Sequence, residues 1–305
     1  LIETTMAPLG IYPILYAFYA EDGTLNRDAM HAQVNACIDA GAHGIAVLGL
    51  ITEVAALSVV ERETIIEWAA EDIAGRVPLA VTIAGDTPEA QLSLSKRAVD
   101  VGANWLILQP PKASQPSGRE LMRFFGRVMD GVEVPVGIQN FPEVLGVGLT
   151  PPEVGELHRL HPNFTVMKGE SPVFQIRQYI DASDGGIHVL NGRGGIELVD
   201  NLRAGCAGII PAPDCADVQI AMYNAYAQGD HARAERLYEL TLPYVIFVMQ
   251  SVDFALTYGK QLTARRLGIT GPAHPRHQQI AADAFGEERL HHHARFMRAF
   301  GHWQE

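Results

Sequence analysis

The feature that most constrains the fold is an alternation of short apolar runs with stretches of helical periodicity, repeated eight times. The apolar runs predict strands over residues 10–15, 44–49, 79–83, 105–109, 134–139, 164–168, 187–190 and 207–210. The stretches that follow them predict helices over residues 26–40, 58–74, 87–101, 117–129, 150–160, 172–182, 194–204 and 214–227. Short strands that are apolar throughout are typical of a parallel sheet buried on both faces. Eight strand–helix units therefore predict an α/β fold, a closed (β/α)8 TIM barrel.

The chain after residue 227 carries no strand pattern. It predicts three further helices, over residues 231–251, 254–267 and 277–299, with a break at residues 268–275 that contains glycine and proline. We therefore expect two units, a barrel domain over residues 1–228 and a C-terminal helical domain over residues 229–305.

Composition and charge exclude several classes of partner. The 305 residues are 48% hydrophobic and 19% charged, which is typical of a globular protein, and the net charge of -12 argues against nucleic acid or an anionic membrane as partner. No apolar run is long enough to span a bilayer, and the start Leu1–Thr5 does not read as a signal peptide. Cys37, Cys206 and Cys215 have no metal-type spacing, so we expect reduced thiols and a cytoplasmic protein.

Metal and cofactor chemistry have little support in the sequence. The run His291–His293 lies in a polar segment with Glu and Arg around it, and we interpret it as a solvated helix face. No cluster of His, Asp and Glu follows the predicted strands, so a metal-dependent aldolase is a weaker alternative. We expect neither a metal site nor a cofactor.

The sixth predicted strand ends on a lysine, Lys168, and only three other lysines occur in the chain: Lys96, Lys112 and Lys260. A buried lysine at a strand end costs free energy unless the protein uses it, and a desolvated amine is a nucleophile near neutral pH. Glu170 points to the same face if the strand geometry continues, because side chains alternate with period two. The alternative is an ordinary lysine that extends to solvent at a strand terminus.

A barrel of this type has its active site at the carboxyl ends of its strands. Lys168 is the lysine that directly ends a predicted strand, which favours its role as nucleophile. The same rim supplies the other candidates: catalytic Gln139 and Glu170, and substrate-binding Ile51, Thr52, Asn140, Gly192, Arg193 and Pro211.

From residue 10 to about 268 the chain resembles the dihydrodipicolinate synthase and N-acetylneuraminate lyase family of Schiff-base lyases. Lys168 matches the family's lysine on the sixth strand, and Gly49 and Glu53 match the outer positions of its Gly-Thr-Thr-Gly-Glu loop. The resemblance implies a barrel with a C-terminal helical domain, a homo-oligomer (tetramer or dimer), and a lysine that forms a Schiff base with a small 2-oxo acid.

The departures from this pattern affect the chemistry. Leu50 and Ile51 replace the two loop threonines, and Thr52 stands at the second glycine. The family's Tyr-Asn-x-Pro reads here as residues 139–142, Gln-Asn-Phe-Pro. That tyrosine shuttles protons in typical members, whereas a glutamine amide cannot transfer a proton at an accessible pKa.

One branch, the L-2-keto-3-deoxyarabonate dehydratases, looks closer. Its members carry a similar Gln-Asp-x-Pro on the fifth strand and Lys-x-Glu-[ST] on the sixth, which matches residues 139–142 and 168–171 here. The apolar Leu50 and Ile51 weaken the match, since the corresponding loop of that branch is polar.

The residues suggest a course for the reaction. The carboxylate of a 2-oxo acid would bind free N–H groups around Ile51 and Thr52 and the Thr52 hydroxyl, although a plain tight loop with a satisfied threonine is equally compatible. Lys168 would add to the carbonyl, and Glu170 would remove a C3 proton. Gln139 would bind substrate or water, or would only pack at the strand end.

These roles favour dehydration of a 2-keto-3-deoxy sugar acid. A pyruvate-dependent aldolase and a dihydrodipicolinate synthase-like condensing enzyme remain alternatives within the family. An alternative of another class is a catalytically degenerate barrel that binds a ligand, because the loop is altered and the tyrosine is missing.

Overall fold

The computed structural model describes residues 8–277 and 279–305. The expectation about the start Leu1–Thr5 lies outside this part of the chain, and so does residue 278 of the predicted helix over residues 277–299. None of the described helices is by itself long and apolar enough to cross a membrane; α10 and residues 252–267 reach that length and composition only together, across a bend of 105°.

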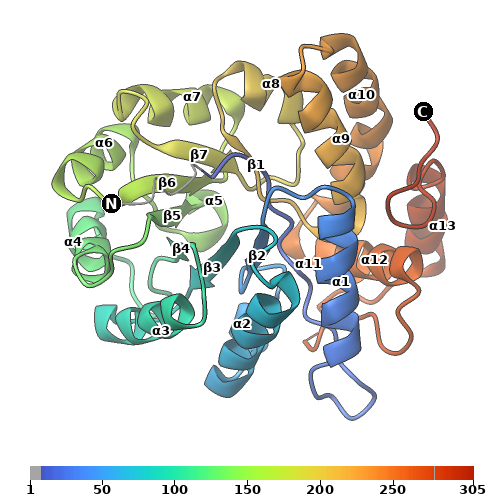
Figure 1. Ribbon diagram of the computed structural model, residues 1–305, viewed down its shortest axis with the longest axis horizontal. Coiled ribbons are helices and arrows are strands. Elements are labelled where there is room, and N and C mark those ends of the chain that lie inside the picture. The colour runs from blue at the N-terminus through green and yellow to red at the C-terminus, as the bar shows by residue number, and fades with distance from the viewer. Residues whose placement is uncertain (1–7, 278) are drawn as a thin grey trace.

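Eight parallel strands form the centre of the molecule (Figure 1). They are β1 (Gly10–Ile11), β2 (Ile45–Val47), β3 (Leu79–Ile83), β4 (Trp105–Leu108), β5 (Val136–Asn140), β6 (Phe164–Gly169), β7 (His188–Asn191) and β8 (Gly208–Ile209). Their order is β1-β8-β7-β6-β5-β4-β3-β2, and a parallel bridge between Ile14 and Ala46 joins the segment after β1 to β2. The sheet therefore closes, and the predicted (β/α)8 barrel is confirmed.

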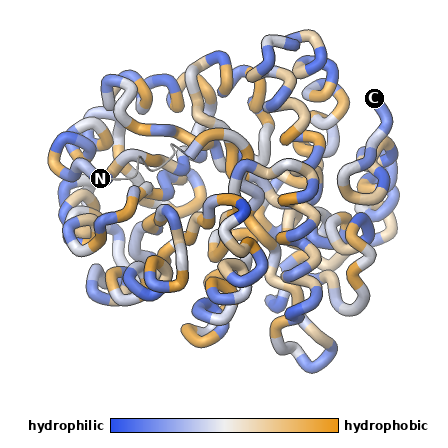
Figure 2. Tube along the Cα trace, in the orientation of Figure 1, coloured by the Kyte–Doolittle hydropathy of each residue, from blue (hydrophilic) through white to orange (hydrophobic). Residues whose placement is uncertain are grey.

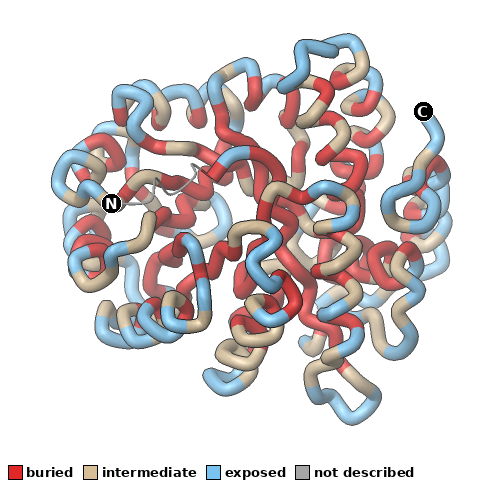
Figure 3. Tube along the Cα trace, viewed as in Figure 1, coloured by how far each residue is buried: buried red, intermediate tan, exposed pale blue. Residues whose placement is uncertain are grey.

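The strands are buried almost throughout, as their apolar sequences predict. Only Thr165 and His188 among the strand residues are partly exposed. Figure 3 shows this buried interior surrounded by helices with exposed outer faces, and Figure 2 shows hydrophilic residues concentrated on the outside. Burial on both faces explains why these strands lack the alternating pattern of a half-exposed sheet.

The helices of the barrel follow the strands as predicted. They are α1 (Arg27–Asp39), η1 (Val54–Ala56), α2 (Val59–Ile73), α3 (Pro88–Asp100), α4 (Gly118–Met129), α5 (Pro142–Leu145), α6 (Pro151–Leu160), α7 (Val173–Ala182), α8 (Leu198–Arg203), η2 (Pro213–Cys215) and α9 (Ala216–Ala227). Ser58 begins α2 and Thr150 begins α6, each in a reciprocal capping box with the residue three positions on.

Two features of the barrel differ from the prediction. Helix α8 is shorter than the predicted residues 194–204, because Gly194 and Gly195 adopt φ of 61° and 93°, outside the helical region. The short helix α5 was not predicted. It ends at Gly146, whose φ is 73°.

The C-terminal part contains α10 (His231–Val248), α11 (Val252–Phe254), a π-helical turn η3 (Ala255–Gly259), α12 (Lys260–Leu267) and α13 (Ala284–His293). The helices α10, α12 and α13 lie together on one side of the barrel (Figure 1). The predicted helix over residues 277–299 is wrong in extent, because α13 begins only where Asp283 accepts a hydrogen bond from the Gly286 N–H. Asp283 is thus an N-cap residue that the prediction from periodicity did not include.

Candidate active site

Strand register brings the residues of the sixth strand beside those of the fifth and seventh. Lys168 pairs with Gln139 on one side and with Leu190 on the other. Side chains at the carboxyl ends of neighbouring parallel strands share one rim, so the register alone places Lys168 and Gln139 together. This agrees with the arrangement expected from the sequence.

Lys168 and Glu170 form a buried ion pair. The Lys168 Nζ lies 2.9 Å from the Glu170 Oε1, and the two side chains are 6% and 4% exposed. The backbone N–H of Glu170 donates to the Asn140 carbonyl at 3.0 Å, which continues the β5–β6 ladder past the last strand residue. This hydrogen bond keeps the strand direction and turns the carboxylate toward the lysine.

A chain of side-chain amides leads to the same carboxylate. The Gln139 Nε2 donates to the Glu170 Oε1 at 2.6 Å, and the Gln109 Nε2 donates to the Gln139 Oε1 at 2.7 Å. The Gln91 amide holds the backbone at this end, donating to the Gln109 carbonyl at 2.7 Å. Glu170 is thus the acceptor at the end of two aligned amides.

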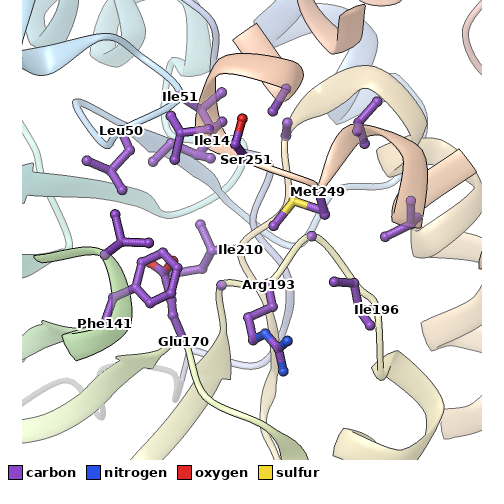
Figure 4. A pocket seen from close by; sticks show the side chains of 18 of the residues that line it. Ile14, Leu50, Ile51, Phe141, Glu170, Arg193, Ile196, Ile210, Met249 and Ser251 are labelled. Atoms are coloured by element: carbon purple, nitrogen blue, oxygen red, sulfur yellow. The ribbon is translucent and has the colours of Figure 1, made fainter. Parts of the chain in front are cut away.

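A cavity of about 240 Å³ opens above the pair. Lys168, Glu170 and Gly192 line this cavity together with side chains of several other elements, some of which are shown in Figure 4. Those labelled in the figure are Ile14, Leu50, Ile51, Phe141, Glu170, Arg193, Ile196, Ile210, Met249 and Ser251. The end of α10 and the residues that follow it, up to Ala255, therefore complete a cavity whose charged pair, Lys168 and Glu170, comes from the barrel.

The loop after β2 carries backbone strain where it meets the cavity. Leu48 and Glu53 both adopt left-handed conformations, with φ of 66° and 60°. Such strain in residues other than glycine often occurs at functional sites. Within the described residues, the N–H groups of Leu50 and Ile51 make no hydrogen bond, and both residues line the cavity. They are suitable donors for a carboxylate.

Thr52 differs from the expectation. Its hydroxyl donates to the Leu15 carbonyl at 2.7 Å, and its N–H donates to the Gly49 carbonyl at 3.1 Å. The residue is fully buried and does not line the cavity. Thr52 ties the loop to the barrel, and both of its donors are already used.

Asn140 and Pro211 also lie outside the cavity lining. The Asn140 amide donates to the Leu149 carbonyl and accepts from the Leu149 N–H, at 2.9 and 2.8 Å, so it holds the loop before α6. The Pro211 carbonyl accepts from the Ile14 N–H at 2.8 Å. Both groups are satisfied inside the protein, which leaves them no donor or acceptor that points to a ligand.

Gly192 and Arg193 line the cavity as expected. A Cβ on Gly192 would lie 2.6 Å from the Glu170 Cγ and 2.7 Å from the Lys168 Cε, so this position admits no larger residue while the pair keeps its geometry. Arg193 is held by Glu197, whose Oε2 accepts from its Nη1 at 3.1 Å.

Comparison with known proteins identifies the family. A model of the dihydrodipicolinate synthetase family matches residues 7–263. The chain belongs to this family. A 4-hydroxy-tetrahydrodipicolinate synthase of Methanoculleus marisnigri is 32% identical over 238 residues, covering 76% of this chain and 81% of the relative.

Two other relatives in the dihydrodipicolinate synthetase family carry different names. An L-2-keto-3-deoxyarabonate dehydratase of Azospirillum brasilense is 26% identical, covering 88% of this chain and 87% of its own length. The crystal structure of YagE from Escherichia coli K12, in complex with pyruvate, is 25% identical with a TM-score of 0.88, covering 94% of this chain and 97% of YagE. The resemblance inferred from the motifs is confirmed, and the family comprises lyases of several specificities.

Sequence reasoning missed a buried polar cluster at the base of the cavity in this family member. Asp214 lines the cavity, and its Oδ2 accepts from the Tyr244 hydroxyl at 2.8 Å. Burial raises the pKa of the Asp214 carboxyl, although the hydrogen bond from Tyr244 partly offsets this effect. The Tyr16 hydroxyl donates to the Ala255 carbonyl at 3.1 Å and holds the π-helical turn. Asp214 comes shortly after the predicted strand over residues 207–210, so its place near the carboxyl end of that strand was the available signal.

A second buried lysine was also missed. Lys260 is completely buried, and its Nζ donates to the Glu53 Oε1 at 2.7 Å and to the His274 carbonyl at 3.0 Å. The Glu53 Oε2 accepts from the Arg276 N–H at 2.7 Å. These bonds fix the left-handed Glu53 and connect the loop after β2 to the C-terminal segment.

Proposed function

We propose that this protein is a Schiff-base lyase that removes water from a 3-deoxy-4-hydroxy-2-oxo acid, the class that includes the 2-keto-3-deoxy sugar acids. One observation carries the proposal: the buried Lys168 amine meets the Glu170 carboxylate at 2.9 Å, and an amide, Gln139, stands where typical relatives have a tyrosine. The site has a nucleophile and a base, and its fifth-strand group cannot shuttle protons.

The first half of the reaction forms the imine. The substrate carboxylate binds the N–H groups of Leu50 and Ile51, which sets the C2 carbonyl over the Lys168 Nζ. The amine adds to the carbonyl and one water leaves, giving an iminium that withdraws electrons from C3. Lys168 adds as the neutral amine after its ammonium form passes a proton to Glu170, which lies beside it. Glu170 returns this proton to the hydroxyl that departs as water, so it enters the elimination as the carboxylate.

The second half is the elimination. Glu170 removes a C3 proton, and the electrons form an enamine. The enamine expels the C4 hydroxyl, which takes up a proton from Glu170 and leaves as water. Hydrolysis of the imine then releases the unsaturated 2-oxo acid and regenerates Lys168. The net change is the loss of one water, without oxidation or reduction.

The relatives support this choice in different ways. The dehydratase of Azospirillum brasilense matches more of this chain than the synthase of Methanoculleus marisnigri does, and YagE, named a putative 2-dehydro-3-deoxy-D-gluconate aldolase, has a structure with pyruvate. An aldolase would deprotonate the C4 hydroxyl and cleave the C3–C4 bond. The missing tyrosine favours elimination over this cleavage.

Borohydride trapping tests the nucleophile. After incubation with pyruvate and reduction, mass spectrometry should find the adduct on the peptide that contains Lys168, and Lys168→Ala should abolish both the adduct and turnover. The exposed Lys112 is an internal control. Labelling on Lys112 alone, or none with any 2-oxo acid, contradicts the proposal. Release of pyruvate instead of water from 2-keto-3-deoxyarabonate would establish the aldolase alternative.

A further inference from the structure

Much of the cavity lining is hydrocarbon. Six side chains, which we call the wall, contribute to it: Ile51, Ile196, Ile210, Val248, Met249 and Val252. These residues come from the loop after β2, the segment before α8, the residue after β8, the end of α10 and the start of α11. Figure 4 shows Ile51, Ile196, Ile210 and Met249 around the space beyond Glu170. The part of a substrate that extends past C4 would contact this wall.

Several of the polar groups around this space are engaged by the protein. The Asp214 Oδ1 accepts from the Cys215 N–H at 2.9 Å, while its Oδ2 is bound to Tyr244. The Arg193 guanidinium is paired with Glu197, and the Gln250 amide donates to the Phe247 carbonyl at 3.0 Å.

Two further polar residues line the cavity, and both are exposed. Glu143 lies on α5, and the Ser251 Oγ accepts from the Phe254 N–H at 3.2 Å. The interior therefore offers few partners for the hydroxyls of a sugar chain.

Burial free energy then selects the substrate. A hydroxyl that loses its hydrating water without gaining a hydrogen-bond partner weakens binding, whereas each CH2 buried against the wall strengthens binding. The cavity volume of about 240 Å³ is enough for a short chain or one ring.

We propose, resting on the proposed function, that the substrate carries a hydrocarbon group at C4, alkyl or aryl, in place of a polyhydroxylated chain. The reaction converts R–CH(OH)–CH2–CO–COO⁻ into R–CH=CH–CO–COO⁻ and water. The C3–H and C4–O bonds break, a C3–C4 double bond forms, and the proton leaves with the hydroxyl. The wall contacts R, and the chemistry at Lys168 is unchanged.

A matched pair of substrates tests the inference. 4-Hydroxy-2-oxohexanoate and 2-keto-3-deoxygluconate share a six-carbon skeleton and differ only in the hydroxyls at C5 and C6, and each is assayed in both configurations at C4. We expect kcat/KM to be roughly 10- to 100-fold higher for the alkyl compound, since each unpartnered hydroxyl weakens binding by about tenfold. Equal rates, or a preference for the hydroxylated acid, would overturn the inference.

A wall variant sharpens the test. Met249→Gln places an amide of similar length in the wall and should lower this preference about fivefold or more, because the amide can hydrogen-bond a hydroxyl. Val60→Gln, at an exposed site on α2, is the matched control and should leave the ratio unchanged. An unchanged ratio in Met249→Gln overturns the assignment of the wall.

Pyruvate trapping is the readout that separates the two proposals. Trapping on Lys168 together with a preference for the hydroxylated acid rejects only the inference about the hydrocarbon group. Absence of trapping rejects the proposed function, and this inference with it.

Discussion

The protein contains two buried lysine–glutamate pairs that are nearly identical in geometry and differ in their surroundings. The Nζ–Oε1 distances are 2.9 Å for Lys168–Glu170 and 2.7 Å for Lys260–Glu53, and all four side chains are at most 6% exposed. Lys168 and Glu170 line the cavity above β6, whereas Lys260 and Glu53 are not among the residues that line it. The contrast separates what a buried charge needs for stability from what it needs for chemistry.

Lys260 is surrounded by partners. Besides Glu53 and the His274 carbonyl, its Nζ lies 4.8 Å from the centre of the Tyr19 ring and 5.4 Å from that of Phe18. Burial lowers the pKa of Lys260, and the adjacent Glu53 carboxylate works against this shift. A nucleophile needs open space for its electrophile, so Lys260 is a structural cation although its burial exceeds that of Lys168.

The comparison predicts opposite consequences for two matched substitutions, and this is the largest effect expected. Lys168→Met should abolish turnover and trapping. Lys260→Met should cost about 3–5 kcal/mol of unfolding free energy, because it leaves Glu53 buried without its cation. Denaturant unfolding and pyruvate trapping of both variants measure the two effects. Equal losses of stability would show that access to the cavity does not distinguish the pairs.

The base can be tested without removing the nucleophile. Glu170→Gln should slow turnover by about 10²- to 10⁴-fold, the usual loss when a general base is removed, while the imine still forms on Lys168. Steady-state rates on this variant measure the loss of turnover, and borohydride trapping on the same sample measures whether the imine still forms. Glu156→Gln, at an exposed site on α6, is the control. A Glu170→Gln protein with near-normal rates would place the base elsewhere.

The smallest expected effect comes from shifting the pair without changing its chemistry. Gly192→Ala forces Lys168 or Glu170 to move, because the added Cβ would lie under 3 Å from both side chains. A misplacement of this size should reduce kcat by about 10- to 100-fold. Gly131→Ala, before β5 at the opposite rim, meets only the end of the Leu92 side chain and should leave kcat unchanged. A Gly192→Ala enzyme of normal kcat would mean that the pair tolerates displacement.

Periodicity and fold rules were sufficient for the barrel and for the place of Lys168 near the carboxyl end of β6. A lysine that ends a buried strand can be recognised from local sequence, and the barrel fold assigns that end to the catalytic rim. The register that places Gln139 beside Lys168 follows from the same strand ends. Each of these inferences needs only the order of residues along short segments.

Other assignments depended on contacts that no local pattern encodes. Thr52 occupies a motif position, yet its hydroxyl binds the Leu15 carbonyl, 37 residues away. Lys260 lies 207 residues from Glu53, and nothing in the helical pattern around Lys260 indicates that it is paired. The local sequence around a polar loop residue is the same whether its side chain faces a ligand or the backbone. Its partner can therefore be identified only from the three-dimensional structure.

The two amides that lead from Gln109 through Gln139 to Glu170 cannot carry protons away from the Glu170 carboxylate. The row begins at Gln109, whose Oε1 has no hydrogen-bond partner among the described residues, and it passes on polarity but no protons. A hydrogen taken from carbon by Glu170 therefore has no exit by this route. If the cavity excludes bulk water during the cycle, the hydrogen removed from C3 departs in the product water. An isotopic label at C3 would then appear in that water molecule.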